Sequence, residues 1–151
     1  GTGIVGLSIA RGARHMVAVD IAPLAARNTR INYERSGQAG RLDVLVGDLF
    51  TPLWGRAFDL IIMNPPYIDD RGEAGDLSWS GGRKGRQVID RFIDEVANHL
   101  SPGGQAFFIQ SDINGLKESV ERARGNGMEI KVVGERHFRF ETLLALEARV
   151  L

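Results

Sequence analysis

The fold is decided by the stretch Asp59-Leu60-Ile61-Ile62-Met63-Asn64-Pro65-Pro66-Tyr67. The apolar run at 60–63 is typical of a strand buried on both faces, as in a parallel sheet covered by helices. Pro65 and Pro66 end this strand because neither has an N–H for the ladder, and Pro66 also disfavours the α conformation at Pro65. We therefore expect residues 64–67 to form a stiff, extended cap at the carboxyl end of a strand, where open α/β sheets bind ligands.

The composition predicts a single domain over residues 1–151. With 151 residues and 43% hydrophobic content, the chain can build one full core but not two ordinary ones. The 19 basic and 19 acidic side chains balance, which disfavours a protein that neutralises many phosphates of a duplex. Cysteine is absent and His15, His99 and His137 lie far apart, so neither disulfides nor a structural metal is expected.

The sequence also indicates where the protein resides. No apolar run approaches the roughly 20 residues of a membrane span, and no basic-then-apolar leader opens the chain. We therefore expect a cytoplasmic protein with no membrane partner.

Strand and helix patterns alternate along the chain. Strands are expected at 15–19, 42–46, 60–63, 106–109, 129–133 and 142–151, and helices at 4–10, 21–33, 87–100 and 116–124. This alternation predicts an α/β fold with a doubly wound, mainly parallel sheet. The last two strands leave no room for a helix between them and must be antiparallel to each other. The residues 101–104, Ser-Pro-Gly-Gly, are expected to form the turn that ends the helix at 87–100.

The segment 68–86 is rich in glycine and charge, and such a segment beside a site is more typical of a binding loop or lid than of a linker. Two interpretations of residues 79–86 stay open. Trp79 packs beside the site, or the basic residues form a patch for an RNA-containing partner. Packing is favoured, and the cations from Arg83 to Arg91 are expected on a solvated face.

The first six residues, Gly-Thr-Gly-Ile-Val-Gly, fit the pattern G-x-G-x-x-G. Glycines at a helix N-terminus let a ligand approach the backbone closely, so we expect Gly1 and Gly3 to bind a nucleoside rather than to form only a tight turn. Asp20 follows the next strand and is expected to accept a hydrogen bond from a ribose hydroxyl; the alternative is a cap of the following helix. The pattern alone fits NAD as well as other nucleosides.

Asp48 follows the expected strand at 42–46 as Asp20 follows the one at 15–19. An acid at this position can accept a hydrogen bond from an exocyclic amine while Leu49 and Phe50 flank a flat ring. The alternative is an ordinary turn aspartate.

Residues 64–67 favour methyl transfer over hydride transfer. The lone pair of an amide or aromatic amine is delocalised, so its nitrogen attacks poorly. The Asn64 side-chain oxygen and the Pro65 carbonyl can accept both N–H bonds of an –NH2 group and so favour a pyramidal nitrogen, while Tyr67 stacks on the flat group. The alternative is a Pro-Pro strand end with an incidental asparagine.

These motifs resemble those of the HemK-type S-adenosylmethionine-dependent methyltransferases, which modify a glutamine side chain of translation release factors. Residues 1–3 are similar to the second half of that family's glycine loop, 47–50 to its adenine-side motif and 64–67 to its catalytic motif. Residues 79–92, 100–102 and 141–143 are similar to the short archaeal and eukaryotic branch. The catalytic residues that the resemblance implies are Asn64, Pro65, Pro66 and Tyr67. The implied contacts of S-adenosyl-L-methionine are Gly1, Thr2, Gly3, Asp20, Ile21, Asp48, Leu49 and Asn64.

The resemblance also implies a seven-strand sheet in the order 3-2-1-4-5-7-6 with an antiparallel last strand, and the first strand is expected upstream of Gly1. It implies a release factor as substrate and a small zinc-binding activator protein at the edge strand Leu42–Val46. A nucleic-acid substrate is less expected. Adenine-N6 methylation of DNA or RNA nevertheless stays open because that class shares Asn-Pro-Pro-Tyr, and a cofactor-binding module without chemistry of its own stays open too.

Overall fold

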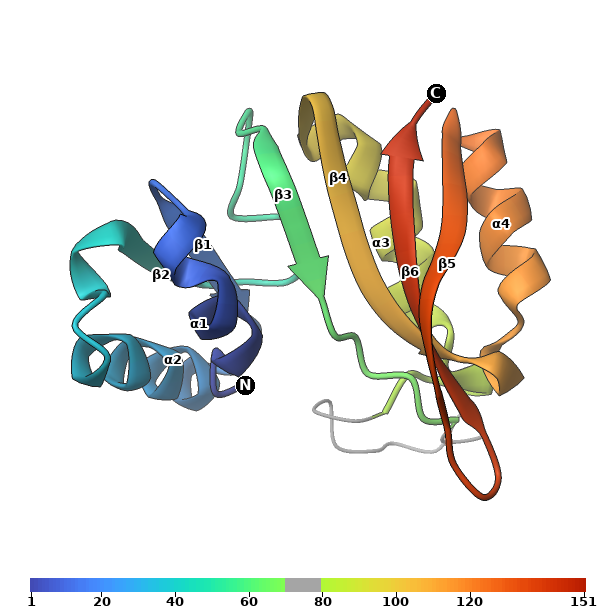
Figure 1. The fold of residues 1–151 in the computed structure, drawn as a ribbon, viewed down its shortest axis with the longest axis horizontal. Helices are drawn as coiled ribbons and strands as arrows, with labels where there is room; N and C mark the ends of the chain where they lie inside the picture. Colours follow the sequence, from blue (N-terminus) through green and yellow to red (C-terminus); the bar gives the residue numbers. More distant parts are fainter. Residues whose placement is uncertain (70–79) are drawn as a thin grey trace. The chain divides into compact units, whose positions relative to one another are not determined.

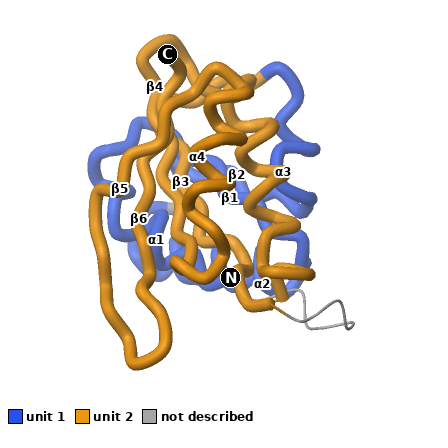
Figure 2. The backbone as a smooth tube through the Cα atoms, turned by 90° about the vertical axis from the view of Figure 1, so that its right-hand side faces the viewer, with its two compact units in different colours: residues 1–55 blue, residues 56–151 orange. Residues whose placement is uncertain are grey.

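The structure is a computed structural model that describes residues 1–69 and 80–151. These residues form two compact units, Gly1–Gly55 and Arg56–Leu151, which Figure 2 colours separately. Each unit has a sheet of its own and helices of its own. The expectation of one domain over 1–151 stays a prediction.

The first unit alternates helix and strand (Figure 1). Its elements are α1 (Ile4–Ile9), η1 (Ala10–Gly12), β1 (Met16–Asp20), α2 (Pro23–Arg35), η2 (Ala39–Arg41) and β2 (Leu42–Val46). β1 and β2 pair in parallel, with Met16 opposite Leu42 and Asp20 opposite Val46. The predicted helices and strands of this unit are confirmed, with ends that differ by at most two residues.

Tyr33 of α2 is 1% exposed and explains two of the early glycines. Its hydroxyl donates to the Met16 sulfur at 3.7 Å, and burial raises the pKa of this phenol. A Cβ atom at Gly3 would lie 3.2 Å from the Tyr33 ring and 2.7 Å from Thr29 Cγ2, and one at Gly6 would meet the Tyr33 hydroxyl. Gly3 and Gly6 therefore let α1 pack closely on α2, which is a structural reason for part of the G-x-G-x-x-G pattern.

The second unit is a four-stranded mixed sheet with two α-helices in the described residues. Its elements are β3 (Phe58–Met63), η3 (Arg83–Gly85), α3 (Gln87–Glu95), η4 (Val96–His99), β4 (Leu100–Ser111), η5 (Asp112–Asn114), α4 (Leu116–Gly125), β5 (Met128–His137) and β6 (Thr142–Val150). The strand order is β3-β4-β6-β5; β3 and β4 are parallel, and β6 is antiparallel to both β4 and β5 (Figure 1). The predicted antiparallel pair at the end of the chain is confirmed.

The core of the second unit is formed by α3, β4 and β6. The Phe92 and Phe108 rings lie 5.4 Å apart at an angle of 59°, and Ile89, Ile93 and Leu146 are at most 1% exposed. The buried positions of α3 recur at three- and four-residue steps, as expected for an amphipathic helix. Burial of each such side chain contributes about 1.5–3 kcal/mol, so this helix is fixed firmly on the sheet.

The turn predicted after this helix is wrong. The helix predicted over 87–100 is an α-helix to Glu95 and continues as the 3-10 helix η4 to His99, but β4 begins at Leu100, so the predicted turn at 101–104 lies inside a strand. Phe58 pairs with Leu100 and Leu60 pairs with Gln105, so residues 101–104 form a bulge in β4. A bulge accommodates the proline and the positive φ of Gly103 while pairing continues on both sides.

β3 and β5 are the edge strands of this sheet. In β3, Leu60 is 42% exposed and Ile62 is 37% exposed, so the prediction of a strand buried on both faces is wrong. β5 extends past the predicted 129–133 to His137, because its pairing with β6 continues after a bulge between Val132 and Gly134. Across the described ranges, no helix is both long enough and apolar enough to cross a membrane.

Candidate functional site

The carboxyl edge of β1 and β2 gathers the predicted cofactor-binding residues of the first unit. Asp20 ends β1 opposite Val46, and the Gly47 N–H donates to the Asp20 carbonyl at 3.0 Å. Because the two strands are parallel, Asp20 and Asp48 leave the sheet at the same edge. The prediction that these two acids close neighbouring strands is confirmed.

Residues 1–3 are held at the same edge by α2. Thr29 Oγ1 donates to the Gly1 carbonyl at 3.2 Å, and Asn32 Nδ2 donates to the Thr2 carbonyl at 2.9 Å. The Gly1 nitrogen contacts the Asp20 carboxylate. Gly3 adopts φ +72° and is the N-cap residue of α1. The structure thus brings the glycine segment and Asp20 together.

The Asp20 carboxylate closes a turn and does not cap α2. Its Oδ1 accepts the Ala22 N–H at 2.9 Å, whereas the N-cap position of α2 is Ala22 itself. The Asp20 side chain is 25% exposed, and the adjacent Ile21 is 50% exposed. A partly exposed carboxylate beside an exposed apolar side chain fits a ribose with a base next to it.

Asp48 lies in a tight turn after β2. The Asp48 carbonyl accepts hydrogen bonds from the Thr51 N–H at 3.0 Å and from the Thr51 hydroxyl at 2.7 Å. The backbone of Asp48 is therefore that of a turn aspartate, the alternative named from the sequence. Leu49 has φ +47°, a left-handed conformation that costs a non-glycine residue about 1–3 kcal/mol. Such strain is concentrated at functional loops, so this turn has a shape beyond what a simple connection needs.

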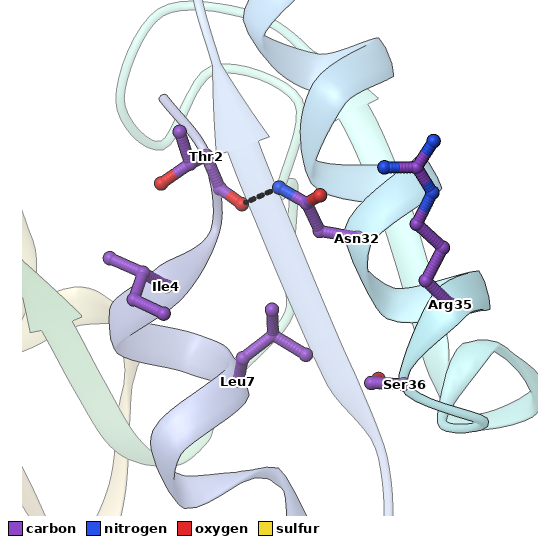
Figure 3. A pocket seen from close by; sticks show the side chains of 6 residues that line it. All are labelled: Thr2, Ile4, Leu7, Asn32, Arg35 and Ser36. Atoms are coloured by element: carbon purple, nitrogen blue, oxygen red, sulfur yellow. Dashed lines mark hydrogen bonds between the residues drawn. The ribbon is translucent and has the colours of Figure 1, made fainter.

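A shallow groove of about 520 Å³ lies between α1 and the last turns of α2 (Figure 3). It is lined by Thr2, Ile4, Leu7, Asn32, Arg35 and Ser36. Of the predicted cofactor contacts only Thr2 belongs to this lining, which contains no acid that could hold a ribose. We therefore do not assign the nucleoside to this groove.

The predicted catalytic residues 64–67 follow β3 directly and continue without helix or strand. The Asn64 side chain is exposed and Pro65 is buried. Beyond this turn, Ile68 pairs with Ser80 in an isolated bridge. The prediction that the strand stops at Asn64 is confirmed.

Two glycines pack against the backbone of this turn. A Cβ atom at Gly81 would lie 2.7 Å from the Pro66 carbonyl oxygen, and one at Gly85 would meet the Tyr67 carbonyl oxygen. Gly81 also donates its N–H to the Ile68 carbonyl at 2.8 Å. The segment 80–86 is therefore a packing support for residues 64–67; Trp79, which was expected to pack there, lies outside the described residues.

Arg86 corrects the expectation of a solvated basic face. Arg83, Lys84 and Arg91 are exposed as expected, but Arg86 is only 9% exposed. Its Nη1 donates to the carbonyl oxygens of Asn114 at 2.6 Å and Gly115 at 2.8 Å, and its Nη2 donates to Asp90 Oδ1 at 2.6 Å. The signal in the sequence was Asp90, one helical turn after Arg86, which favours an i,i+4 ion pair.

Asn114 was not among the residues predicted from the sequence. Its side-chain Nδ2 donates to the Tyr67 carbonyl at 2.8 Å, although 47 residues separate the two. A polar residue just after the carboxyl end of β4, beside β3, was the available signal, because neighbouring parallel strands end at the same edge.

A comparison with protein-family models matches residues 1–139 to the methyltransferase small domain. A Methanocaldococcus jannaschii protein assigned as an N5-glutamine methyltransferase is 31% identical over 98% of this chain and 77% of its own length. The methyltransferase HEMK2 of Mus musculus is 31% identical over 85% of this chain and 64% of its length. The release factor glutamine methyltransferase of Aquifex aeolicus is 32% identical over 69% of this chain, which spans 41% of that protein.

Solved structures share the fold. A chain of the E. cuniculi Mtq2–Trm112 complex, responsible for methylation of the eRF1 termination factor, is 20% identical with a TM-score of 0.64 over 100% of this chain and 96% of that chain. The T. Thermophilus 16S rRNA N2 G1207 methyltransferase, solved with AdoMet and guanosine, is 21% identical with a TM-score of 0.75 over 100% of this chain and 35% of that one. At these identities the likeness shows a class I methyltransferase-like α/β fold and no more.

Proposed function

Because the chain belongs to the HemK-type glutamine methyltransferases of the methyltransferase small-domain family, we propose that it methylates a glutamine side-chain amide of a translation release factor with S-adenosyl-L-methionine. The observation that carries the proposal is Asn64, an exposed asparagine at the carboxyl end of β3 whose following backbone is fixed by Gly81 and Gly85. This arrangement serves an acceptor that presents an –NH2 group on a planar carbon.

The chemistry follows from how residues 64–67 can hold that group. The Asn64 side-chain oxygen and the Pro65 carbonyl accept the two N–H bonds, which draws the nitrogen toward a pyramidal geometry and frees its lone pair. Tyr67 stacks on the amide plane and fixes its orientation. The amide nitrogen then forms a bond to the methyl carbon as the carbon–sulfur bond breaks, the electron pair stays on sulfur, and the surplus proton leaves the nitrogen to water afterwards.

The cofactor supplies a methyl group activated by a sulfonium charge. In our proposal the cofactor lies close to the backbone of Gly1, Thr2 and Gly3, and Asp20 accepts hydrogen bonds from the ribose of the cofactor. The remaining expected contacts are Ile21 and Leu49 against the adenine, Asp48 toward the adenine amine, and Asn64 near the methyl group. The residues present fit such a ligand because the edge of β1 and β2 combines a partly exposed carboxylate, exposed glycine backbone and the strained Leu49.

The proposal extends to the finer features of the family. These are a seven-strand sheet, of which the described residues supply six strands in two sheets, a small zinc-binding activator at Leu42–Val46, and a cytoplasmic location together with the release factor. In support of the activator, β2 is a sheet edge that pairs with β1, and its Val46 is 54% exposed.

The test is methylation by the full-length protein, alone and with a small zinc-binding partner, using labelled S-adenosyl-L-methionine. The acceptors are a release factor, a glutamine peptide from it, and adenine-containing DNA and RNA. Mass spectrometry should find one added methyl group on a glutamine. A methyl group on adenine would instead assign the protein to the adenine-N6 methyltransferases. An absence of methylation on every acceptor would reject the proposed function.

Variants of Asn64 separate catalysis from cofactor binding. Asn64→Ala should abolish turnover while calorimetry shows nearly unchanged affinity for S-adenosylhomocysteine, because the side chain acts on the acceptor. Asn98→Ala, at an exposed position of η4, is the matched control. Unchanged turnover of Asn64→Ala would refute the role proposed for Asn64.

A further inference from the structure

Asn114 joins three segments of the second unit through one side chain. It is 2% exposed and lies in η5, directly after β4. Its Nδ2 donates to the Tyr67 carbonyl at 2.8 Å and to the Lys84 carbonyl at 3.0 Å, while its Oδ1 accepts the Ser111 N–H at 2.9 Å. One amide thus links the catalytic turn at 64–67, the glycine-rich segment and the end of β4.

The chemistry of the partners fixes the orientation of this amide. The Tyr67 and Lys84 carbonyls can only accept, and the Ser111 N–H can only donate. A flipped amide would place its oxygen against two carbonyl oxygens and its NH2 against an N–H, so the orientation with Nδ2 toward Tyr67 is the one compatible with all three contacts.

The backbone of Asn114 is held from a second direction. Arg86 Nη1 donates to the Asn114 carbonyl at 2.6 Å and to the Ser119 hydroxyl at 3.2 Å, and the guanidinium is anchored by Asp90. Gly85 packs so closely on the Asn114 amide and the Tyr67 carbonyl that an added Cβ would meet both. The amide therefore has little freedom to move away from Tyr67.

We propose that Asn114 is a positioning residue for methyl transfer, which acts by holding the Tyr67 peptide group and thereby the acceptor-binding geometry of residues 64–67. This inference rests on the proposed function. The Pro65 carbonyl and the Tyr67 ring are oriented by the backbone of one short turn, and the Asn114 amide ties the last carbonyl of that turn to the sheet. Because a displacement of about 1 Å in a reacting group can lower a rate on the order of 100-fold, such a hold matters for turnover.

The test is Asn114→Asp in the full-length protein, which keeps the shape and removes both donors. We expect kcat to fall about 100-fold while affinity for S-adenosylhomocysteine changes less than about twofold. The two facing carbonyl oxygens raise the pKa of the introduced carboxyl, while the Ser111 N–H and the nearby Arg86 guanidinium act in the opposite direction. Its protonated form can again donate to one of the carbonyls. The ratio of variant to wild-type kcat should therefore rise as the pH is lowered, which a variant that merely lost stability would not show.

Two controls accompany this variant. Asn98→Asp makes the same chemical change at an exposed position in η4, which precedes the opposite end of β4, and should leave kcat and its pH profile unchanged. Ile93→Val removes a buried carbon from α3 without touching residues 64–67 and shows what lost stability alone does to kcat.

Hydrogen exchange without substrate tests the hold itself. The amides of Gly81, Lys84 and Gly85 donate to Ile68, Asp69 and Gly82 in the wild type, and all three should exchange faster in Asn114→Asp but not in the controls. A wild-type protein that methylates no glutamine would reject the proposed function. The exchange rates would still show whether Asn114 holds the Tyr67 peptide group in place. The role of Asn114 would be overturned if the three amides of Asn114→Asp exchanged at the wild-type rates. It would also be overturned if kcat fell no further in Asn114→Asp than in Ile93→Val.

Discussion

Arg86 donates to the Asn114 carbonyl oxygen over 2.6 Å, across 28 residues of sequence. This contact joins the glycine-rich segment to the end of β4 through a buried guanidinium that also bonds Gly115, Ser119 and Asp90. The planar fork of an arginine serves several acceptors at once, which the single ammonium of a lysine cannot reproduce. The contacts of Arg86 thus depend on its residue type, and not only on a positive charge.

We accordingly predict that Arg86→Lys is destabilising although it preserves charge. The free energy of unfolding should fall by about 2 kcal/mol, because buried carbonyl oxygens lose charged hydrogen-bond donors. Urea unfolding followed by circular dichroism measures the change. Arg83→Lys, on an exposed side chain, should stay within about 0.5 kcal/mol of the wild type. Equal effects of the two variants would contradict the structural role of Arg86.

Gly85→Ala should disturb both stability and turnover. Gly85 has φ +66°, and an added Cβ would meet the Tyr67 carbonyl oxygen, so the left-handed backbone and the contact both act against alanine. We expect a loss of about 2 kcal/mol or more in the free energy of unfolding and a lower kcat on a glutamine acceptor. Gly125→Ala provides the comparison, since no atom lies within 4 Å of a Cβ added there and the residue ends α4. It should be neutral or stabilising by up to about 1 kcal/mol.

Substitutions of Tyr67 distinguish stacking from hydroxyl chemistry. If the ring acts by stacking on the acceptor amide, Tyr67→Phe should retain most of kcat/KM and Tyr67→Ala should lose about tenfold. Steady-state kinetics on a glutamine peptide measure both. A loss in Tyr67→Phe as large as in Tyr67→Ala would assign the effect to the hydroxyl group.

The pair of Asp94 and Arg122 predicts a pH-dependent contribution to stability. Arg122 donates to both carboxylate oxygens of Asp94 at 2.8 and 2.7 Å, and this hydrogen bonding lowers the pKa of Asp94 below 3.8. Since the folded pKa is the lower one, the stabilisation is present above pH 3.8 and is lost as the pH falls through the folded value. Asp94→Asn should therefore lower the free energy of unfolding at pH 7, by about 0.5–1 kcal/mol for this partly exposed pair, and have less effect as the pH approaches 3.

Glu121→Gln is the control for that measurement. Lys117 and Glu121 lie 3.7 Å apart on exposed side chains of α4, and such a pair contributes little. Urea unfolding at several pH values should show no pH-dependent difference between this variant and the wild type. An Asp94→Asn effect that grew on acidification would contradict the lowered pKa of Asp94.

The sequence pattern was sufficient to predict helices and strands where local preference and tertiary environment favour the same structure. The strand Leu42–Val46 has the predicted ends, and β3 stops before Asn64 as the two prolines require. The antiparallel arrangement of β5 and β6 followed from a connection too short for a crossover. The bulge at 101–104 was not predictable in this way, because Ser-Pro-Gly-Gly has turn chemistry and is kept in a strand only by pairing of β4 with β3.

The support of the site was harder to predict than its motifs. The glycines at 81 and 85 were visible in the sequence, but that their Cα atoms face the carbonyls of Pro66 and Tyr67 is a tertiary fact. The same holds for the burial of Arg86 and for the long-range contact of Asn114 with Tyr67. The sequence indicates candidate ligand contacts through the chemistry of their side chains. The residues that support them are found only from contacts in the structure.

The edge position of β3 affects how the second unit would behave by itself in solution. Its outer N–H and C=O groups, together with exposed Leu60 and Ile62, form a template for pairing with the same strand of another molecule. Residues 56–151 produced alone should therefore self-associate with rising concentration. A lysine introduced at Leu60 should suppress this association, since a charge on an edge strand opposes strand pairing between molecules.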